Sequence, residues 1–385
     1  MQERTRAYLR GRFGDYYRRA EIRTPPAGHE REWGYVPWTE GPGETYVRHN
    51  AMLDMGGLSD FLARERPRHV YFSAGRYENP SASTMQEKGW KSSDLIFDLD
   101  ADHLPATGVD DSYAEMLAAC KEALFRLLDF LETDFAFEEL QVVFSGSRGY
   151  HVHVRDDNVE HLDRDARREI VDYVRGIGLD PDGLFRTEMR GNVTARVLPT
   201  EGGWGRRVHR RLLDFVEELE RLDRAEAMER LQQLDGIGEG RADTVYGAIQ
   251  QNPEAIRAGN MEAGGVGIRT LVESLVHEVV AEQNAPIDEP VSTDTNRLIR
   301  LPGSLHGGSG LAVRPIERDA VEAFDPLTDA VPEAFTSHEI AVEVADGGRV
   351  ELGGDSFMLA EGVHTVPEYL GVFLMCRGRA EKGKE

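Results

Sequence analysis

Cysteine and long apolar segments are scarce in this sequence of 385 residues. The two cysteines, Cys120 and Cys376, lie far apart along the chain, which argues against a disulfide framework and against a cysteine-based zinc site. No apolar run is long enough to cross a bilayer, and the first residues lack the apolar core of a signal peptide. We therefore expect a globular cytoplasmic protein that has no membrane partner.

Lysine is also rare, because only five of the 45 basic residues are lysines. The chain has 69 acidic residues, so its formal net charge is −24. An acidic, lysine-poor surface suits a cytosol that holds molar salt, where self-repulsion is screened. Our leading hypothesis is a halophilic protein. The alternative is an acidic protein that avoids nucleic acid, although a local basic site can exist within an acidic surface.

Short strand-like segments occur on both sides of a long charged stretch. Alternating or apolar runs predict strands at residues 69–73, 95–100, 140–144, 150–154 and 297–301, with strand-like sequence again between 338 and 351. Apolar residues recur at helical spacing from Tyr113 to Phe135. Between residues 159 and 283 the pattern is mostly helical, which indicates an inserted or appended helical subdomain. Residues 1–60 give few clear signals.

The stretch LIFDLDADH, residues 95–103, places Asp98 and Asp100 on one face of a strand, because side chains two residues apart point the same way. Such a pair could be the nucleophile and acid of an aspartyl-phosphate phosphatase, or a pair of ligands for divalent metal ions. The phosphatase interpretation requires a following Gly-Thr and a later lysine. Here Ala101 and Asp102 follow, and no lysine occurs between Lys121 and Lys382. That interpretation is weakened, and both remain open.

Two further segments carry groups that suit phosphate. The turn SGSRG, residues 145–149, offers backbone N–H groups and Arg148, although its glycines could merely close a hairpin. The segment IDEPVSTDTNRLIRLPGSLHGG, residues 287–308, offers the carboxylate of Asp288, the cation Arg300 and a turn containing His306. Each segment has a structural explanation by itself. The three segments together, spread over most of the chain, share no single structural explanation.

The sequence resembles the catalytic small subunit of the archaeal and eukaryotic replicative DNA primases, from about Arg31 to Val313. The resemblance lies in the motifs YFSAGRYENPSAS, KGWKSSDLIFDLDADHL, SGSRGYHVHV and RLIRLPGSLHG. It implies an α/β (α+β) fold with a catalytic core of mixed β-sheets flanked by helices. The core would comprise residues 1–158 and 284–385, and residues 159–283 would form a helical insertion.

The resemblance also implies an activity and its residues. The chain would be a DNA-templated nucleotidyltransferase that makes short primers on single-stranded DNA from nucleoside triphosphates, together with a primase large subunit. Two Mg²⁺ or Mn²⁺ ions would be held by Asp98, Asp100 and Asp288. The nucleotide would be contacted by Ser145, Arg148, His151, Arg300 and His306. A repair-type polymerase that extends existing primers is the main alternative. A non-catalytic binding subunit is disfavoured because it would not need the three carboxylates.

Some positions depart from the family pattern. Ser147 and Gly308 stand where relatives often carry a basic residue, so less positive charge surrounds the triphosphate and a requirement for high salt or metal is plausible. Many relatives hold a zinc knuckle after the Asp pair, but residues 102–140 supply only His103 and Cys120. We therefore expect no structural zinc.

The most basic run in this acidic chain spans Arg206 to Arg211, beside Trp204. It could bind template or primer phosphates. The commoner explanation is a helix whose arginines pair with nearby acids such as Asp214, Glu217 and Glu218.

Overall fold

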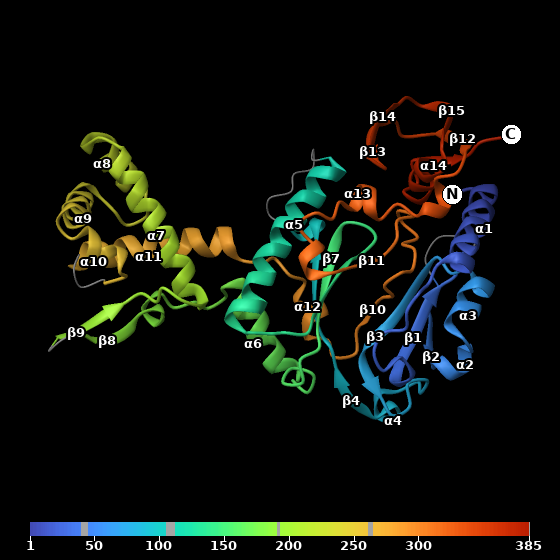
Figure 1. Ribbon diagram of the computed structural model, residues 1–385, viewed down its shortest axis with the longest axis horizontal. Helices are drawn as coiled ribbons and strands as arrows, with labels where there is room; N and C mark the ends of the chain where they lie inside the picture. The colour runs from blue at the N-terminus through green and yellow to red at the C-terminus, as the bar shows by residue number, and fades with distance from the viewer. Residues whose placement is uncertain (40–44, 105–111, 191–192, 261–264, 385) are drawn as a thin grey trace. The chain divides into compact units, whose positions relative to one another are not determined.

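The computed structural model describes residues 1–39, 45–104, 112–190, 193–260 and 265–384 (Figure 1). The chain forms two compact units. Unit 1 comprises residues 1–122, 138–168 and 286–385, and unit 2 comprises residues 123–137 and 169–285. Helices and antiparallel sheets are both present, which confirms the predicted mixed α/β class. The domain boundaries expected at 158/159 and 283/284 stay a prediction.

The first sheet of unit 1 is antiparallel and is built around one long buried strand. Its order is β10-β3-β1-β2, with β4 also pairing with β3. The strands are β1 (Arg31–Val36), β2 (Val47–Asn50), β3 (His69–Tyr77), β4 (Trp90–Ser93) and β10 (Leu298–Arg300). The helices of this part are α1 (Glu3–Arg19), α2 (Met52–Met55), α3 (Leu58–Glu65) and α4 (Met85–Lys88). The strand β3 extends past the predicted residues 69–73 because residues 75–77 pair with β4 and remain mostly buried.

The second sheet of unit 1 carries the Asp pair. Its antiparallel order is β11-β6-β7-β5. The strands are β5 (Leu95–Asp100), β6 (Leu140–Phe144), β7 (Gly149–Val154) and β11 (Arg314–Ile316). Helix α5 (Tyr113–Asp129) buries Cys120, whose Sγ lies 3.6 Å from the Leu99 carbonyl oxygen, so this cysteine is a core side chain. Helix α12 (Glu289–Thr293) also packs against β5.

A buried ionic network joins the two sheets immediately before β5. The Asp94 carboxylate accepts hydrogen bonds from Arg31 of β1 at 2.7 Å and from Arg155, which follows β7, at 2.9 Å. The Asp94 backbone N–H donates to the Ala74 carbonyl of β3. Burial alone would raise the pKa of Asp94, but His153 and the positive charges of Arg31 and Arg155 hold that pKa well below its usual range. The network therefore positions the start of β5 between the sheets.

The C-terminal part of unit 1 has one apolar helix enclosed by short strands. Strands β12 (Glu339–Val344), β15 (Gly362–Pro367) and β16 (Ala380–Lys382) form one sheet, and β13 (Gly348–Leu352) pairs with β14 (Asp355–Leu359). Helix α13 (Pro326–Asp329) precedes them. Helix α14 (Glu368–Cys376) is almost entirely buried, which fits its nearly continuous apolar sequence. The buried Glu368 carboxylate accepts hydrogen bonds from Arg12 of α1.

Unit 2 is mainly helical. Its elements, together with α6 (Arg164–Arg175), which begins in unit 1, are α7 (Gly203–Arg221), α8 (Arg224–Gln232), α9 (Glu239–Gln251), α10 (Pro253–Arg257), α11 (Gly265–Gln283) and the hairpin β8 (Arg186–Arg190) and β9 (Val193–Val197). Helix α7 buries an apolar stripe through Val208, Leu212 and Phe215. Helix α8 begins at a capping box, in which Asp223 and Glu226 satisfy each other's backbone N–H groups.

Most arginines of the basic run Arg206–Arg211 form ion pairs within unit 2. Arg206 and Arg207 both pair with Asp129, and Arg207 also pairs with Asp134. Arg211 pairs with Glu278. These arginines are thus paired with acids as expected, but the partners come from distant segments rather than from Asp214, Glu217 and Glu218 of the same helix.

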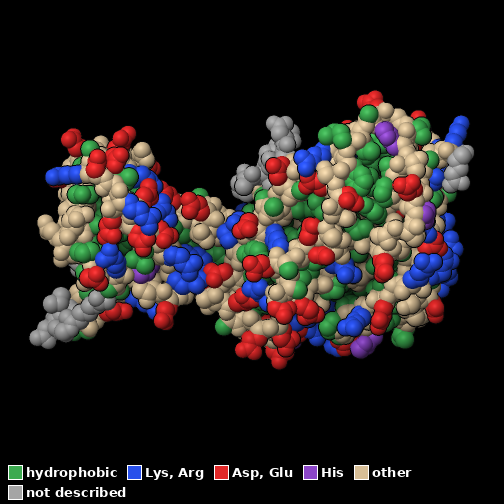
Figure 2. Space-filling view, turned by 45° about the horizontal axis from the view of Figure 1, so that its top comes forward, with side chains coloured by type: hydrophobic (Ala, Val, Ile, Leu, Met, Phe, Trp, Pro, Cys, Tyr) green, Lys and Arg blue, Asp and Glu red, His purple; other side chains and the backbone are tan. Residues whose placement is uncertain are grey.

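Acidic side chains are spread over the visible face of the chain rather than gathered in one patch (Figure 2). Among the helices that the structure describes, none combines the length and apolar character needed to span a membrane.

Candidate active site

The Asp pair lies at the end of β5, beside the central strand β7. Asp98 is in register with His151, and Asp100 is in register with Gly149. His151 Nε2 lies 3.5 Å from Asp98 Oδ1. The alternation of β5 leaves Asp98 and Asp100 partly exposed while Phe97 and Leu99 are buried, so the two carboxylates share the open face as predicted.

Glycines in the turn between β6 and β7 allow two close approaches. A Cβ at Gly149 would lie 1.8 Å from the Leu99 carbonyl oxygen, so β7 can approach β5 only with glycine there. Gly146 has φ +81°, and a Cβ there would lie 2.7 Å from the Cβ of His306. The turn therefore brings the segment containing His306 next to the Asp pair.

The third predicted carboxylate residue is held against the first by the backbone. The Asp288 N–H donates to the Asp98 carbonyl oxygen at 2.9 Å, and Asp288 occupies the N-cap position of α12 without a capping hydrogen bond from its side chain. Burial and the negative charges of Asp100 and Asp288 raise the pKa of Asp98 to about 7, although Arg300 and Arg297 oppose the rise. The three residues thus create a concentration of negative charge that a cation would relieve.

The donor chemistry of this group fits a hard divalent cation. Carboxylate oxygens are the ligands that Mg²⁺ and Mn²⁺ prefer, and mutual repulsion raises the pKa of Asp98. In the part of the chain that the structure describes, no three His, Cys, Asp or Glu side chains are already gathered as metal ligands. The fit therefore rests on donor type, shared face and charge. The zinc expectation stays a prediction, since residues 105–111 and the His103 side chain lie outside the described part.

Seven of the eight predicted site residues line one cavity of about 260 Å³, and Asp288 adjoins it through Asp98. The seven are Asp98, Asp100, Ser145, Arg148, His151, Arg300 and His306. Arg148 pairs with Asp102 at 2.7 Å, and its Nε lies 4.0 Å from Asp100. The Arg300 Nε is buried and has no hydrogen-bond partner among the described residues. The cavity therefore contains both carboxylates and cationic side chains, and Arg148 lies beside the carboxylates.

Two of the three histidines that line the cavity, His151 and His306, were predicted as site residues, and both are buried and neutral. Burial, followed by the charge of Arg300 and other positive groups, lowers the pKa of His306 well below its usual value, and burial does the same for His151. The Gly308 N–H donates to His306 Nδ1 at 3.1 Å, so the proton of this imidazole is on Nε2. His306 can therefore donate a hydrogen bond to a phosphate oxygen while it remains uncharged.

Four further residues line the same cavity and were not singled out from the sequence: Tyr46, Arg68, His69 and Tyr71. His69 and Tyr71 alternate along β3, and Tyr71 is in register with Arg300 of β10. The Arg300 guanidinium carbon lies 5.6 Å from the centre of the Tyr71 ring. The only sequence signal was the polar and aromatic alternation of HVYFS, which predicts a strand but not which side faces the site.

The cleft continues on the other side of Asp98. A second cavity of about 590 Å³ shares Asp98, His151 and Arg300 with the first, and adds Arg48 and Arg297. Arg48 is held by two contacts to the buried Glu32 carboxylate, at 3.1 and 3.3 Å. Asp98 therefore lines two adjoining cavities that both contain arginine side chains, which suits two phosphate-bearing reactants that meet at Asp98.

Acidic residues flanked by guanidinium and imidazole donors define the class of metal-dependent nucleotidyltransferases, which must bind a triphosphate and its metal ions together. Residues 97–318 match the model of the DNA primase small subunit family. Over the full length of both chains, this chain is 63% identical to a DNA primase small subunit PriS of Haloarcula marismortui and 59% identical to that of Halorubrum lacusprofundi. It is 39% identical to that of Methanococcoides burtonii, again over both full chains.

The chain belongs to the DNA primase small subunit family. This confirms the resemblance found in the motifs and argues against the phosphatase interpretation. The two most similar of these relatives carry the genus names of salt-loving organisms, which agrees with the halophile hypothesis drawn from the charge.

Proposed function

We propose that this chain is the catalytic subunit of a DNA primase, which synthesises short primers on single-stranded DNA from nucleoside triphosphates. The observation that supports this most strongly is the convergence of Asp98, Asp100, Arg148, Arg300 and His306 on one cavity, from three separate sequence segments. The repair-type polymerase alternative would use the same cavity, so the distinction rests on activity without a primer.

In this proposal Asp98, Asp100 and Asp288 hold two Mg²⁺ or Mn²⁺ ions. The chemistry supplied by such ions is activation of a 3′-hydroxyl and neutralisation of charge on the leaving pyrophosphate. Asp98 must be deprotonated to act as a ligand, and the raised pKa of about 7 makes this sensitive to pH near neutrality.

The chain's own donors hold the triphosphate. The Arg148 side chain is half-exposed at the turn, and it can release Asp102 and bind phosphate oxygens instead. Arg300 approaches from β10, and its partnerless Nε can turn to the same oxygens. His306 donates from Nε2, and Ser145 contributes a hydroxyl from the turn. Neutral imidazoles orient the phosphates without forming a fixed ion pair that would retain the product.

A larger partner subunit belongs to the same proposal, because the relatives are named small subunits. Two nucleotides must bind before any primer exists, so we expect weak initiation by this chain alone and stronger initiation with the large subunit. We also propose that the chain lacks a structural zinc.

The test is synthesis on unprimed single-stranded DNA with labelled nucleotides and Mg²⁺ or Mn²⁺ in concentrated KCl, with and without the large subunit. The wild type should make products that the Asp98→Ala, Asp100→Ala variant does not. A matched control is Asp157→Ala with Asp319→Ala, two exposed carboxylates outside the cavity, which should keep synthesis intact.

Two other outcomes of the synthesis assay would favour the alternative functions. Extension of a pre-annealed primer without synthesis from unprimed template would support the repair-type polymerase. Release of phosphate from a phosphomonoester, without any synthesis, would restore the phosphatase interpretation.

A further inference from the structure

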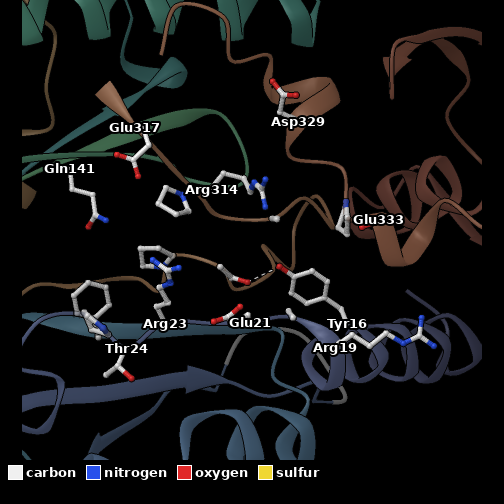
Figure 3. A pocket seen from close by; sticks show the side chains of 18 of the residues that line it. Tyr16, Arg19, Glu21, Arg23, Thr24, Gln141, Arg314, Glu317, Asp329 and Glu333 are labelled. Carbon is white, nitrogen blue, oxygen red and sulfur yellow. Dashed lines mark hydrogen bonds between the residues drawn. The ribbon is translucent and has the colours of Figure 1, made fainter. Parts of the chain in front are cut away.

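A larger cavity lies in unit 1 and shares no lining residue with the candidate active site (Figure 3). Its volume is about 840 Å³, within the range of small-molecule sites. One wall is the end of α1 with the following residues 19–26, and the opposite wall is β11 with the adjoining segments. The cavity reaches inward to Phe72 of β3 and to Arg155.

Positive groups in this cavity are unusually available. Among the described residues, no carboxylate oxygen lies within 4.0 Å of the guanidinium groups of Arg19, Arg23 or Arg314, although acidic residues outnumber basic ones by 69 to 45. Figure 3 shows Arg23 and Arg314 entering the space from opposite walls. Deeper inside, Arg155 is held rigidly by Asp94 and Gln141. An arginine pair of this kind is suited to phosphate oxygens.

The rest of the lining offers acceptors and flat apolar surfaces. Carboxylates that have no partner among the described residues lie near the arginines at Glu21, Glu317 and Glu333, where they can accept hydrogen bonds from hydroxyl groups. Five prolines supply flat apolar walls: Pro25, Pro26, Pro302, Pro315 and Pro332. A ligand that matches this lining has an anionic end, hydroxyl donors and a planar ring.

We propose that this cavity is a second nucleotide-binding site, separate from the catalytic one. The phosphates lie between Arg23 and Arg314, the ribose hydroxyls face the carboxylates, and the base lies against the proline walls. The site also adjoins the catalytic machinery through one loop. Tyr16 donates a hydrogen bond to the Gly303 carbonyl at 2.7 Å, and the same loop continues to His306. Occupancy of the second site therefore bears on a loop that reaches the first.

The test is equilibrium dialysis of the whole chain with labelled ATP and Mg²⁺ in concentrated KCl, without DNA. The wild type should bind two ATP per chain. Arg148→Ala with His306→Ala should leave one site, Arg23→Glu with Arg314→Glu should leave the other, and the four changes together should leave none. Each double variant should weaken its own site at least tenfold. The control is Arg4→Glu with Arg10→Glu, exposed residues of α1 outside the cavity, which makes the same change in charge.

Binding of as many ATP per chain by the Arg23→Glu, Arg314→Glu variant as by the wild type would overturn the proposal. Competition identifies the ligand class. In the Arg148→Ala, His306→Ala variant, unlabelled ADP should displace labelled ATP at least tenfold better than inorganic pyrophosphate does. Equal displacement by pyrophosphate would mean that the base contributes nothing, and the nucleotide assignment would fail. Because no synthesis is measured, this result is independent of whether the chain proves to be a primase.

Discussion

Replacement of Asp94 by alanine should strongly destabilise unit 1. The Asp94 side chain is fully buried, and so is its partner Arg31, whose guanidinium lies 2.7 Å from the Asp94 carboxylate. Arg155 makes a second contact at 2.9 Å. Removal of the carboxylate leaves the buried Arg31 charge uncompensated, which costs about 3–5 kcal/mol in comparable buried pairs. We therefore expect the free energy of unfolding to fall by about that amount.

The measurement is urea unfolding in concentrated KCl, followed by tryptophan fluorescence in a Trp204→Phe background. The remaining tryptophans, Trp33, Trp38 and Trp90, all lie in unit 1, so the signal reports on that unit alone. The control is Glu351→Ala, which removes the ion pair between Glu351 and Arg349. These side chains are 43% and 64% exposed, respectively. An exposed pair of this kind contributes about 1 kcal/mol or less.

Salt gives a second criterion. Because Asp94 and Arg31 are shielded from solvent, the loss on Asp94→Ala should be the same at moderate and at high KCl, whereas the small Glu351→Ala effect should shrink. Asp94→Asn should fall between the wild type and the alanine variant, since the amide can still accept a hydrogen bond. A loss below about 1 kcal/mol for Asp94→Ala would refute the claim that this network joins the two sheets.

Three further predictions concern the site and the charge. Without divalent ions at pH 8, Asp98→Asn should stabilise the fold by about 2 kcal/mol. A pKa raised from 3.8 to about 7 is converted at about 1.36 kcal/mol per pKa unit, and only half of the result is counted because the Asp98 side chain is partly exposed. The raised pKa means that the folded wild type gains stability as pH falls from 8 toward 3.8, so the advantage should fall to less than half in urea melts at pH 5; an equal advantage at both pH values contradicts the assignment. Gly149→Ala should lower the free energy of unfolding by about 3 kcal/mol and abolish synthesis, because the added Cβ would lie 1.8 Å from the Leu99 carbonyl oxygen. The control, Gly11→Ala on the open face of α1, should be neutral or stabilising in the same melts. The thermal midpoint should rise with KCl because the net charge is −24, and a midpoint independent of salt would end the halophile hypothesis.

Local sequence patterns were sufficient to predict a strand or helix where neighbouring residues determine it. Strand β6 occupies the predicted residues 140–144, and β7 begins one residue before its prediction, because alternation and glycine punctuation are local signals. Helix α1 was missed, since its buried stripe contains only Leu9, Phe13 and Tyr17 between many arginines. The apolar segment near Tyr369 proved to be helix α14, whose apolar residues show no period because all sides are buried.

The candidate active site likewise combines features that local sequence patterns predict with features that depend on tertiary packing. Alternation predicts that Asp98 and Asp100 share a face, but the contact of Asp288 with Asp98 depends on how α12 packs on β5. His151 and His153 could have been edge residues by sequence, yet β7 is an inner strand. His153 is fully buried, stacks on Phe72 at 6.1 Å and lies 4.0 Å from Asp94. Residues of β3 enter the site through pairing with β10 and through the contact of His69 with His306, which no local pattern predicts.

The backbone bond between Asp288 and Asp98 has a consequence for how this chain can evolve. The segment that leaves unit 1 after Arg168 returns at Pro286, and Arg168 pairs with Glu289 at 3.2 Å, so both ends are fastened beside the carboxylates. Doubling the length of a chain closed at such a point costs only about 0.6 kcal/mol. Loops within residues 169–285 can therefore be lengthened with little disturbance to the chemistry, provided that the contacts of Arg206 and Arg207 with Asp129 and Asp134 are kept, whereas a residue added between Asp288 and α12 would disturb the packing beside the carboxylates.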